Sequence, residues 1–229
     1  PEFESSIYTG LNLSALSMAT TVCDAQTITL ILNKLIQINN KYNDKSTQKQ
    51  IKSLFNEIEF YNIFISSCSN GRLDLVKFFL SDESPFKINE QMILQSLSIM
   101  ISSSNEKSKD IITLLMNLDF DINKKVSPRN QSLLTISALS GAISTMEQII
   151  VHNRFAPDKQ EVKLALFNII SSTNAVLINS LLNFLDNDIN QINQNGESLL
   201  IVAVSLSSFN NVSLIINHVS FNPIRSMAK

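Results

Sequence analysis

Val76-Lys77-Phe78-Phe79-Leu80 is the first clear copy of an apolar pattern that recurs along this chain. Each copy begins with an aliphatic anchor and continues into large apolar residues. The pattern returns after roughly 34 residues, a period typical of stacked supersecondary units that are each too small to bury an apolar face alone. Chains of this kind commonly bind other proteins, so the pattern favours a binding function. The anchors are Val76, Ile112, Met146, Ile178 and Val212.

The composition predicts a folded chain with a continuous core. Of the 229 residues, 44% are hydrophobic and 17% are charged, and the formal net charge is −2. This apolar content is far above that of disordered chains. The charge balance offers no basic face for nucleic acid and no polybasic segment for a membrane surface. The longest apolar run, Leu199 to Val204, is much shorter than the roughly 20 residues that span a membrane.

The two cysteines, Cys23 and Cys68, indicate a reducing compartment. They form neither a metal-ligand spacing nor a redox pair. Because no signal peptide is recognisable either, we expect a cytoplasmic or nuclear location. Residues 1–3, Pro-Glu-Phe, resemble a cloning remnant and are excluded from fold reasoning.

Each anchor lies on the second of two short predicted helices. Two independent landmarks give the same register. Ser132 and Ser198, at predicted helix starts, are separated by two periods of the pattern, and so are His152 and His218 near predicted helix ends. The predicted first helix, turn and second helix are 132–139, 140–142 and 143–152 in one pair, and 198–206, 207–210 and 211–218 in another.

The turn, second helix and polar tail resemble the ankyrin repeat. Asn70 to Leu80 is similar to the family's turn and second helix, and Asn195 to Leu200 to its helix start. Leu114 to Asn123 is similar to its tail, and Asp188-Ile189-Asn190 repeats the end of that tail. The resemblance covers residues 58–223. It implies an all-α, ankyrin-like solenoid of about six stacked helix-turn-helix repeats with short hairpin connections.

The chain departs from the family pattern at several structural positions. Helix starts read Ser-Leu-Leu where the family has Pro and His, and only four glycines are available for helix ends. At helix C-termini that lack a glycine, Asn or Asp can adopt the left-handed backbone conformation at some energetic cost. Residues 4–57 are interpreted as a divergent N-terminal capping repeat with a polar insertion at 39–49, and 224–229 as a C-terminal tail. Apolar spacing over 51–65 predicts one extended helix, or two that break near Glu59.

No pattern in the sequence predicts catalysis, a cofactor or a metal site. His152 and His218 occupy matched positions near helix ends, where the helix dipole favours a structural role. The four glycines are isolated, so no glycine-rich phosphate loop is present. The paired acids lack the ligand count and glycine turn of a calcium loop, so we interpret them as solvated turn residues. They are Asp119, Asp121, Asp186 and Asp188.

Two hairpins and a series of phenylalanines are the candidate partner-binding features. Lys124, Lys125 and Arg129 form one hairpin, which we call the basic finger and which suits an acidic peptide. The uncharged hairpin 191–195 suits hydrogen bonding to a peptide backbone. Solvated loops without a partner are the alternative for both hairpins. The phenylalanines near hairpin entries either pack between repeats or form an aromatic stripe that anchors a partner, and burial distinguishes these alternatives. The phenylalanines are Phe86, Phe120, Phe155 and Phe221. The candidate binding residues are Lys124, Lys125 and Arg129 in the finger, Gln191, Asn193, Gln194 and Asn195 in the hairpin, and Phe120 and Phe155.

The sequence therefore favours a non-catalytic protein–protein interaction module, a scaffold or recruitment domain of a larger protein. By resemblance, a partner peptide or domain would bind the concave face formed by hairpin tips and first helices. The alternative is a substrate-recruiting or regulatory arm of an enzyme whose catalytic domain lies outside this sequence. We expect no nucleic-acid partner, and homotypic assembly stays open because degenerate repeat ends can expose apolar surface.

Overall fold

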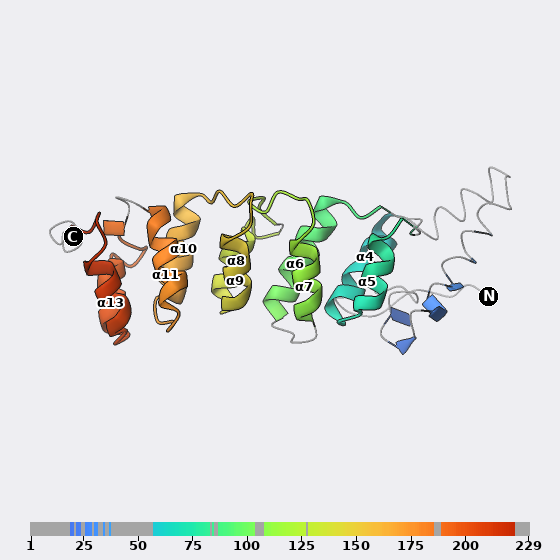
Figure 1. The fold of residues 1–229 in the computed structure, drawn as a ribbon, viewed down its shortest axis with the longest axis horizontal. Coiled ribbons are helices and arrows are strands. Elements are labelled where there is room, and N and C mark those ends of the chain that lie inside the picture. The colour runs from blue at the N-terminus through green and yellow to red at the C-terminus, as the bar shows by residue number, and fades with distance from the viewer. Residues whose placement is uncertain are drawn as a thin grey trace. The chain divides into compact units, whose positions relative to one another are not determined.

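The protein is all-α throughout the described residues, and its helices pack mainly against their neighbours along the chain (Figure 1). A computed structural model describes residues 57–82, 84, 87–103, 108–126, 128–185 and 189–222, together with 19–20, 22–23, 26–28, 30–31, 34 and 37. Extended pairing within this part is limited to two isolated bridges, and no sheet forms. No helix found there is both long and apolar enough to cross a membrane.

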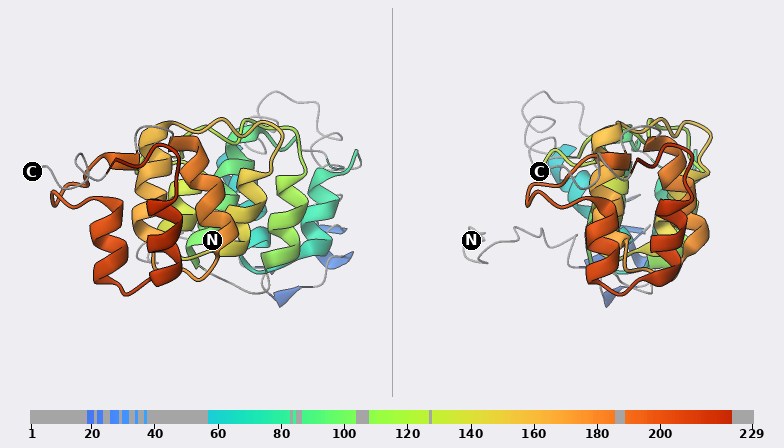
Figure 2. Two further views of the ribbon diagram at one scale, coloured as in Figure 1. Left: turned by 60° about the vertical axis from the view of Figure 1, so that its left-hand side comes forward. Right: turned by 90° about the vertical axis from the view of Figure 1, so that its left-hand side faces the viewer.

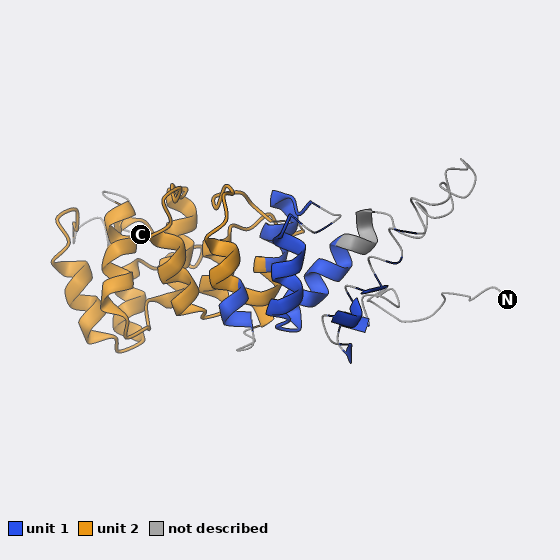
Figure 3. Ribbon diagram, turned by 45° about the vertical axis from the view of Figure 1, so that its right-hand side comes forward, with its two compact units in different colours: residues 1–96, 106–111 blue, residues 97–105, 112–229 orange. Residues whose placement is uncertain are grey.

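The described helices fall into two compact units (Figure 3). Residues 1–96 and 106–111 form the first unit, and residues 97–105 and 112–229 form the second, so the division passes through α6 and α7. The helices are α4 (Glu57–Ser69), α5 (Leu73–Leu80), α6 (Glu90–Ser103), α7 (Lys109–Met116), α8 (Leu133–Leu139), α9 (Ile143–Ile150), α10 (Lys159–Ile169), α11 (Ala175–Leu185), α12 (Leu199–Ser205) and α13 (Phe209–Ile216).

In the first unit, α4 and α5 form an antiparallel pair around an aromatic contact. The rings of Phe64 and Phe79 meet edge to face, with centroids 6.2 Å apart. Both rings are buried, and each contributes on the order of 2 kcal/mol through the apolar area it removes from water. The Arg72 guanidinium at the inter-helix turn donates to the carbonyl oxygens of Thr20 and Cys23, at 2.8 and 2.6 Å.

In the second unit, the helix pairs α8–α9, α10–α11 and α12–α13 build two layers. α10 packs against α8 and α12 in one layer, and α11 packs against α9 and α13 in the other (Figure 2). Of the five anchors that define the apolar pattern, four are buried, and Val212 in the last pair is half-buried. The pattern therefore identifies the core face of the second helices.

Matched serines begin two of the first helices. The Ser132 and Ser198 side chains each accept a hydrogen bond from a backbone N–H in the first turn of the helix, at 3.3 Å in both helices. Each serine thus satisfies a donor that a helix start leaves unpaired. Both N-caps have extended backbone, with φ −74° and ψ 161° at Ser132 and φ −79° and ψ 161° at Ser198.

Two asparagines connect successive helix pairs through the same pattern of contacts. The Asn123 side chain donates to the Arg154 carbonyl at 2.6 Å and accepts from the Ala156 N–H at 2.8 Å. Asn190 makes the corresponding bonds, to the Ser220 carbonyl and from the Asn222 N–H, both at 2.7 Å. The last residue of each Asp-Ile-Asn tail therefore forms two hydrogen bonds to the segment that follows the next helix pair. We call these contacts the asparagine ties.

The structure corrects two predicted helix bounds and decides one alternative that the sequence left open. α13 begins at Phe209, which the sequence places in the turn, and ends at Ile216. α9 ends at Ile150, so His152 follows its C-cap instead of lying within the helix. α4 is continuous through Glu59, which excludes a break at that residue. The polar insertion at 39–49 and most of the predicted capping repeat lie outside the described residues.

Candidate functional site

The hairpin that follows α11 is built around one asparagine. Ile192 and Ser198 form an isolated antiparallel bridge, and Gly196 takes the positive φ of 78° that the tip requires. Inside the hairpin, the Asn193 carboxamide oxygen accepts from the backbone N–H groups of Asn195 and Glu197, both at 2.9 Å. Asn193, a predicted binding residue, therefore uses its side chain to hold the hairpin together.

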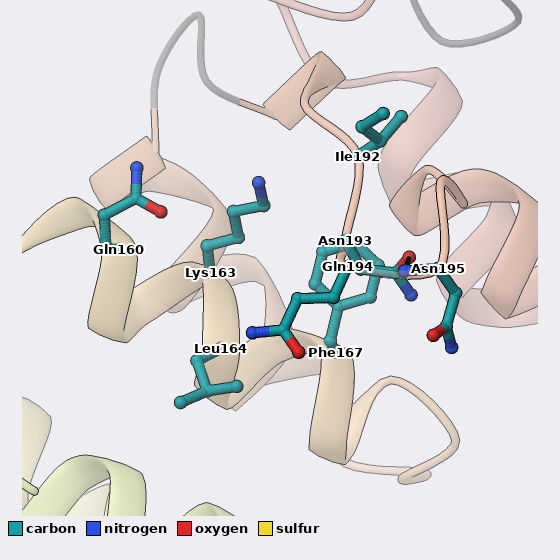
Figure 4. A pocket seen from close by; sticks show the side chains of 8 residues that line it. All are labelled: Gln160, Lys163, Leu164, Phe167, Ile192, Asn193, Gln194 and Asn195. Carbon is teal, nitrogen blue, oxygen red and sulfur yellow. Dashed lines mark hydrogen bonds between the residues drawn. The ribbon is translucent and has the colours of Figure 1, made fainter. Parts of the chain in front are cut away.

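This hairpin and α10 enclose a groove of about 530 Å³ (Figure 4). One side of α10 contributes four side chains at helical spacing, and the hairpin contributes Ile192 and the three residues after it. The volume lies within the usual range for small-ligand and peptide-side-chain pockets, roughly 300–1,000 Å³. The lining residues are Gln160, Lys163, Leu164, Phe167, Ile192, Asn193, Gln194 and Asn195.

The chemistry of the groove combines an apolar floor with amide groups. Leu164 is 45% exposed and Ile192 is 41% exposed, so both leave substantial apolar area in contact with solvent. Gln194 and Asn195 are exposed at the hairpin, and each amide can both donate and accept hydrogen bonds. Lys163 supplies the positive charge of the lining, and its ammonium lies 3.3 Å from the Gln191 side-chain oxygen. This arrangement suits an extended chain segment with one or more apolar side chains.

The basic finger is partly neutralised within the protein. The Lys125 ammonium pairs with the Glu161 carboxylate of α10 at 3.0 Å. This hydrogen-bonded carboxylate raises the pKa of Lys125 above its usual value. Lys124 and Arg129 are exposed near the tip, where Asn130 takes a positive φ of 53°. Because Lys125 already has an acidic partner, the finger offers an acidic peptide less charge than its sequence indicates.

The phenylalanines do not form one exposed stripe. Phe120 is only 1% exposed, and its ring lies 5.7 Å from the His152 ring. Phe155 is half-buried and packs edge to face on Phe184, with centroids 5.3 Å apart. Phe221 is also half-buried, and Phe86 lies outside the described residues. Burial thus assigns Phe120 to the core, which corrects its placement among the candidate binding residues.

The two histidines have one local role. Nδ1 of His152 accepts from the Arg154 N–H at 3.2 Å, and Nδ1 of His218 accepts from the Ser220 N–H at 3.3 Å. Each ring therefore organises the turn that leaves its helix. Among the described residues, no group of three or more His, Cys, Asp or Glu side chains is placed to bind a metal ion.

The groove brings together only part of the predicted set. Asn193, Gln194 and Asn195 line it, and the Gln191 side chain is bonded to Lys163 of the lining. The basic finger, Phe120 and Phe155 do not line it. Sequence reasoning missed the contribution of α10. The available signal was Leu164-Ala165-Leu166-Phe167, because four consecutive apolar residues exceed what a helix needs for one core-facing side. Ala165 and Leu166 are buried, which leaves Leu164 and Phe167 to face the groove.

Comparison of the chain with protein-family models, with curated proteins and with solved structures found no match.

Proposed function

We propose that this chain is a non-catalytic protein-interaction module, built from divergent ankyrin-like repeats, that binds an extended segment of another protein. The repeat assignment is supported by contacts that recur two periods apart along the chain. They include the serine caps, the histidine turns and the asparagine ties. A repeated set of unrelated contacts is expected when one structural unit is used more than once.

The groove between α10 and the hairpin is the observation that carries the binding function. Peptide-recognition sites commonly combine pockets for side chains with groups that bond the peptide backbone. Leu164, Phe167 and Ile192 supply an apolar floor, and the hairpin amides supply donors and acceptors. A segment bound here would place an apolar side chain against the floor and its backbone against Gln194 and Asn195.

Selection from a displayed library of random linear peptides tests this function. Peptides enriched on the wild-type chain are then measured by fluorescence anisotropy against Leu164→Glu, which puts a charge on the apolar floor. Binding should weaken at least tenfold, which corresponds to about 1.4 kcal/mol. Val176→Glu is the matched control, because Val176 is exposed at the start of α11 and does not line the groove.

Gln194→Ala and Asn195→Ala test the hairpin amides without removing the internal support that Asn193 gives. Each substitution should weaken the same peptides by a smaller factor, about threefold to tenfold. Failure to enrich any peptide, or equal binding to wild type and Leu164→Glu, would contradict the proposal.

A further inference from the structure

The tip of the hairpin that follows α11 places an asparagine carboxamide directly before a glycine. Asn195 is exposed, and among the described residues its carboxamide has no hydrogen-bond partner. In Figure 4 this side chain points away from the other labelled side chains. A Cβ built at Gly196 meets nothing within 4 Å, so the space around the glycine is open. The Asn195 side chain can therefore approach the backbone of the residue that follows it.

This pair of residues supplies both reacting groups for cyclisation of the asparagine, which is a chemically labile residue type. The Gly196 peptide nitrogen loses its proton to a solvent base and attacks Cγ of Asn195. A new C–N bond forms, the bond from Cγ to the side-chain nitrogen breaks, and that nitrogen leaves as ammonia. Water then opens the cyclic imide at either of its carbonyl carbons, which gives aspartate or isoaspartate. The net reaction is a hydrolysis that releases ammonium, and nothing is oxidised or reduced.

The hairpin restrains this reaction through Asn193. The Gly196 N–H donates to the Asn193 carbonyl oxygen at 3.1 Å. The Asn193 side-chain oxygen accepts from the N–H groups of Asn195 and Glu197, both at 2.9 Å. These bonds hold the attacking nitrogen in the turn, so the tip must open before the ring can close. Exposed tips outside a packed core open at a low cost in free energy, so the restraint slows the reaction without preventing it.

The same dipeptide occurs at the end of α4 in a more restrained setting. Asn70 is also exposed, and the Gly71 N–H donates to the Cys68 carbonyl oxygen at 3.1 Å, the distance found at the hairpin tip. The Asn70 carboxamide, however, donates to the Ser66 hydroxyl at 3.1 Å. The Arg72 N–H also bonds back into the helix, at 2.9 Å. Cyclisation at Asn70 must break a side-chain bond and open a helix end, so this site should react more slowly.

We propose that Asn195 is a site of spontaneous deamidation at the rim of the groove, and that Asn193 limits its rate. The product aspartate carries a negative charge and only accepts hydrogen bonds, whereas the amide both donates and accepts. Isoaspartate also adds a carbon atom to the backbone within the turn. The modification thereby changes the lining of the groove as the protein ages. Only its effect on a bound segment rests on the proposed function.

Peptide mapping of the aged protein tests the proposal. The folded wild-type chain is kept in mildly alkaline buffer for several weeks, digested and analysed by liquid chromatography with tandem mass spectrometry. Asn195 should gain the mass of oxygen in exchange for NH, and aspartate and isoaspartate should appear as separate products. Direct hydrolysis of the side chain would give aspartate alone. Asn70 in the same sample should react about threefold to tenfold more slowly, as expected for one additional hydrogen bond that must break.

Unfolding in urea is the first control, because the two sites should then react at similar rates. Asn193→Ala should accelerate the reaction at Asn195 by about threefold to tenfold. Asn168→Ala, at an exposed position of α10 that does not line the groove, should leave the rate unchanged. Circular dichroism establishes that both variants are folded. If Asn193→Ala does not fold, the comparison of folded and unfolded wild type decides the question.

Three results on the folded wild type overturn the proposal: an unmodified Asn195, aspartate as the sole product, or a rate at Asn70 that equals or exceeds the rate at Asn195. A folded Asn193→Ala chain that reacts no faster than the wild type overturns the role of Asn193. Mass spectrometry detects the modification without a ligand, so these outcomes are distinct from a failure of the peptide selection.

Discussion

Ser207 occupies a backbone position that the chain elsewhere gives to glycine. Its φ is 55°, and Gly141, in the corresponding inter-helix turn two periods earlier, has φ 66°. The hairpin tips show the same exchange, because Asn130 and Gly196 are also two periods apart and both have positive φ. Asn130 lies at a hairpin tip and not at a helix end, where the sequence suggested Asn or Asp as substitutes for glycine; at the helix end the residue is a serine, which was not predicted. A serine here carries a steric cost, because a Cβ crowds the backbone in the left-handed region.

Ser207→Gly should therefore stabilise the protein. Relief of the left-handed strain, about 1–2 kcal/mol, exceeds the extra unfolded-state entropy of glycine, about 0.5–1 kcal/mol. The net expectation is a rise of about 0.5–1 kcal/mol in the free energy of unfolding. Urea denaturation followed by circular dichroism measures it.

Gly141→Ala is the reciprocal control. A Cβ built at Gly141 meets nothing within 4 Å, so any loss comes from the backbone conformation alone. After the same unfolded-state entropy offset, we expect a decrease of about 0.5–1 kcal/mol in the free energy of unfolding. A neutral Gly141→Ala, together with a destabilising Ser207→Gly, would show that strain is not what distinguishes these turns.

At the scale of the helix pairs, the asparagine ties join one pair to the next. Asn190→Ala removes both bonds to the segment after α13 and leaves the Ser220 carbonyl and the Asn222 N–H without this partner. We expect a loss of about 1–3 kcal/mol, with faster amide hydrogen exchange in α12 and α13 than in α8 and α9. The control is Asn168→Ala, whose side chain is exposed and bonds only within its own helix in the contact described, to the Leu164 carbonyl.

Asn211 links α13 to the end of α10. Its buried amide nitrogen lies 2.6 Å from the Ile170 carbonyl oxygen and 2.8 Å from that of Ser172, so it donates to two carbonyl oxygens at and just beyond the C-cap of α10. Asn211→Asp replaces this donor with a buried anion that faces carbonyl oxygens. The free energy of unfolding should fall by about 3 kcal/mol or more at neutral pH.

The loss at Asn211→Asp should depend on pH. Burial and the facing carbonyls favour the protonated acid, so the folded-state pKa of the new carboxyl exceeds its unfolded value of about 3.9. Stability is then lost as pH rises above the unfolded pKa and is regained on acidification toward about pH 4. Asn210→Asp, at the exposed neighbouring position, should show neither effect. Thermal melts of both variants across this pH range make the comparison.

At the scale of the whole molecule, the buried thiol of Cys68 is a probe for whether the first unit is folded. Burial raises the pKa of its thiol from 9.0 to about 12, with a smaller opposing effect from the Ser96 hydroxyl. Because the folded pKa is the higher one, the contribution to stability is complete below about pH 9 and is lost as pH rises toward about 12. Stability should therefore fall more steeply across this range in the wild type than in Cys68→Ala.

Alkylation supplies an independent measurement. The thiolate is the reactive form, so Cys68 should resist iodoacetamide at about pH 9 until urea unfolds the protein. Cys23 is half-exposed and serves as the internal reference for reagent activity. Mass spectrometry of the two cysteine-containing peptides gives the two rates. Equal labelling of both residues in the native protein would contradict the assignment of Cys68 to a closed core.

The sequence is most informative where one local pattern determines one local contact. Ser132 and Ser198 are predicted helix starts, and both are N-caps; the apolar anchors are predicted core residues, and four of the five are buried. The groove is harder to predict, because it depends on which side of α10 meets a hairpin that follows only after the whole of α11. The burial of Phe120 could not be predicted from the sequence either, because a recurring Phe has the same spacing whether its ring is buried or exposed to solvent.

The sequential packing of the second unit also bears on how the chain is made. The pairs α10–α11 and α12–α13 each dock on the pair that precedes them, and each asparagine tie reaches the segment after the next pair. At a synthesis rate of roughly 5–20 residues per second, the next pair follows within about 2–7 seconds. We expect layers to assemble on the ribosome in order, each newly docked pair shielding the one before it from aggregation.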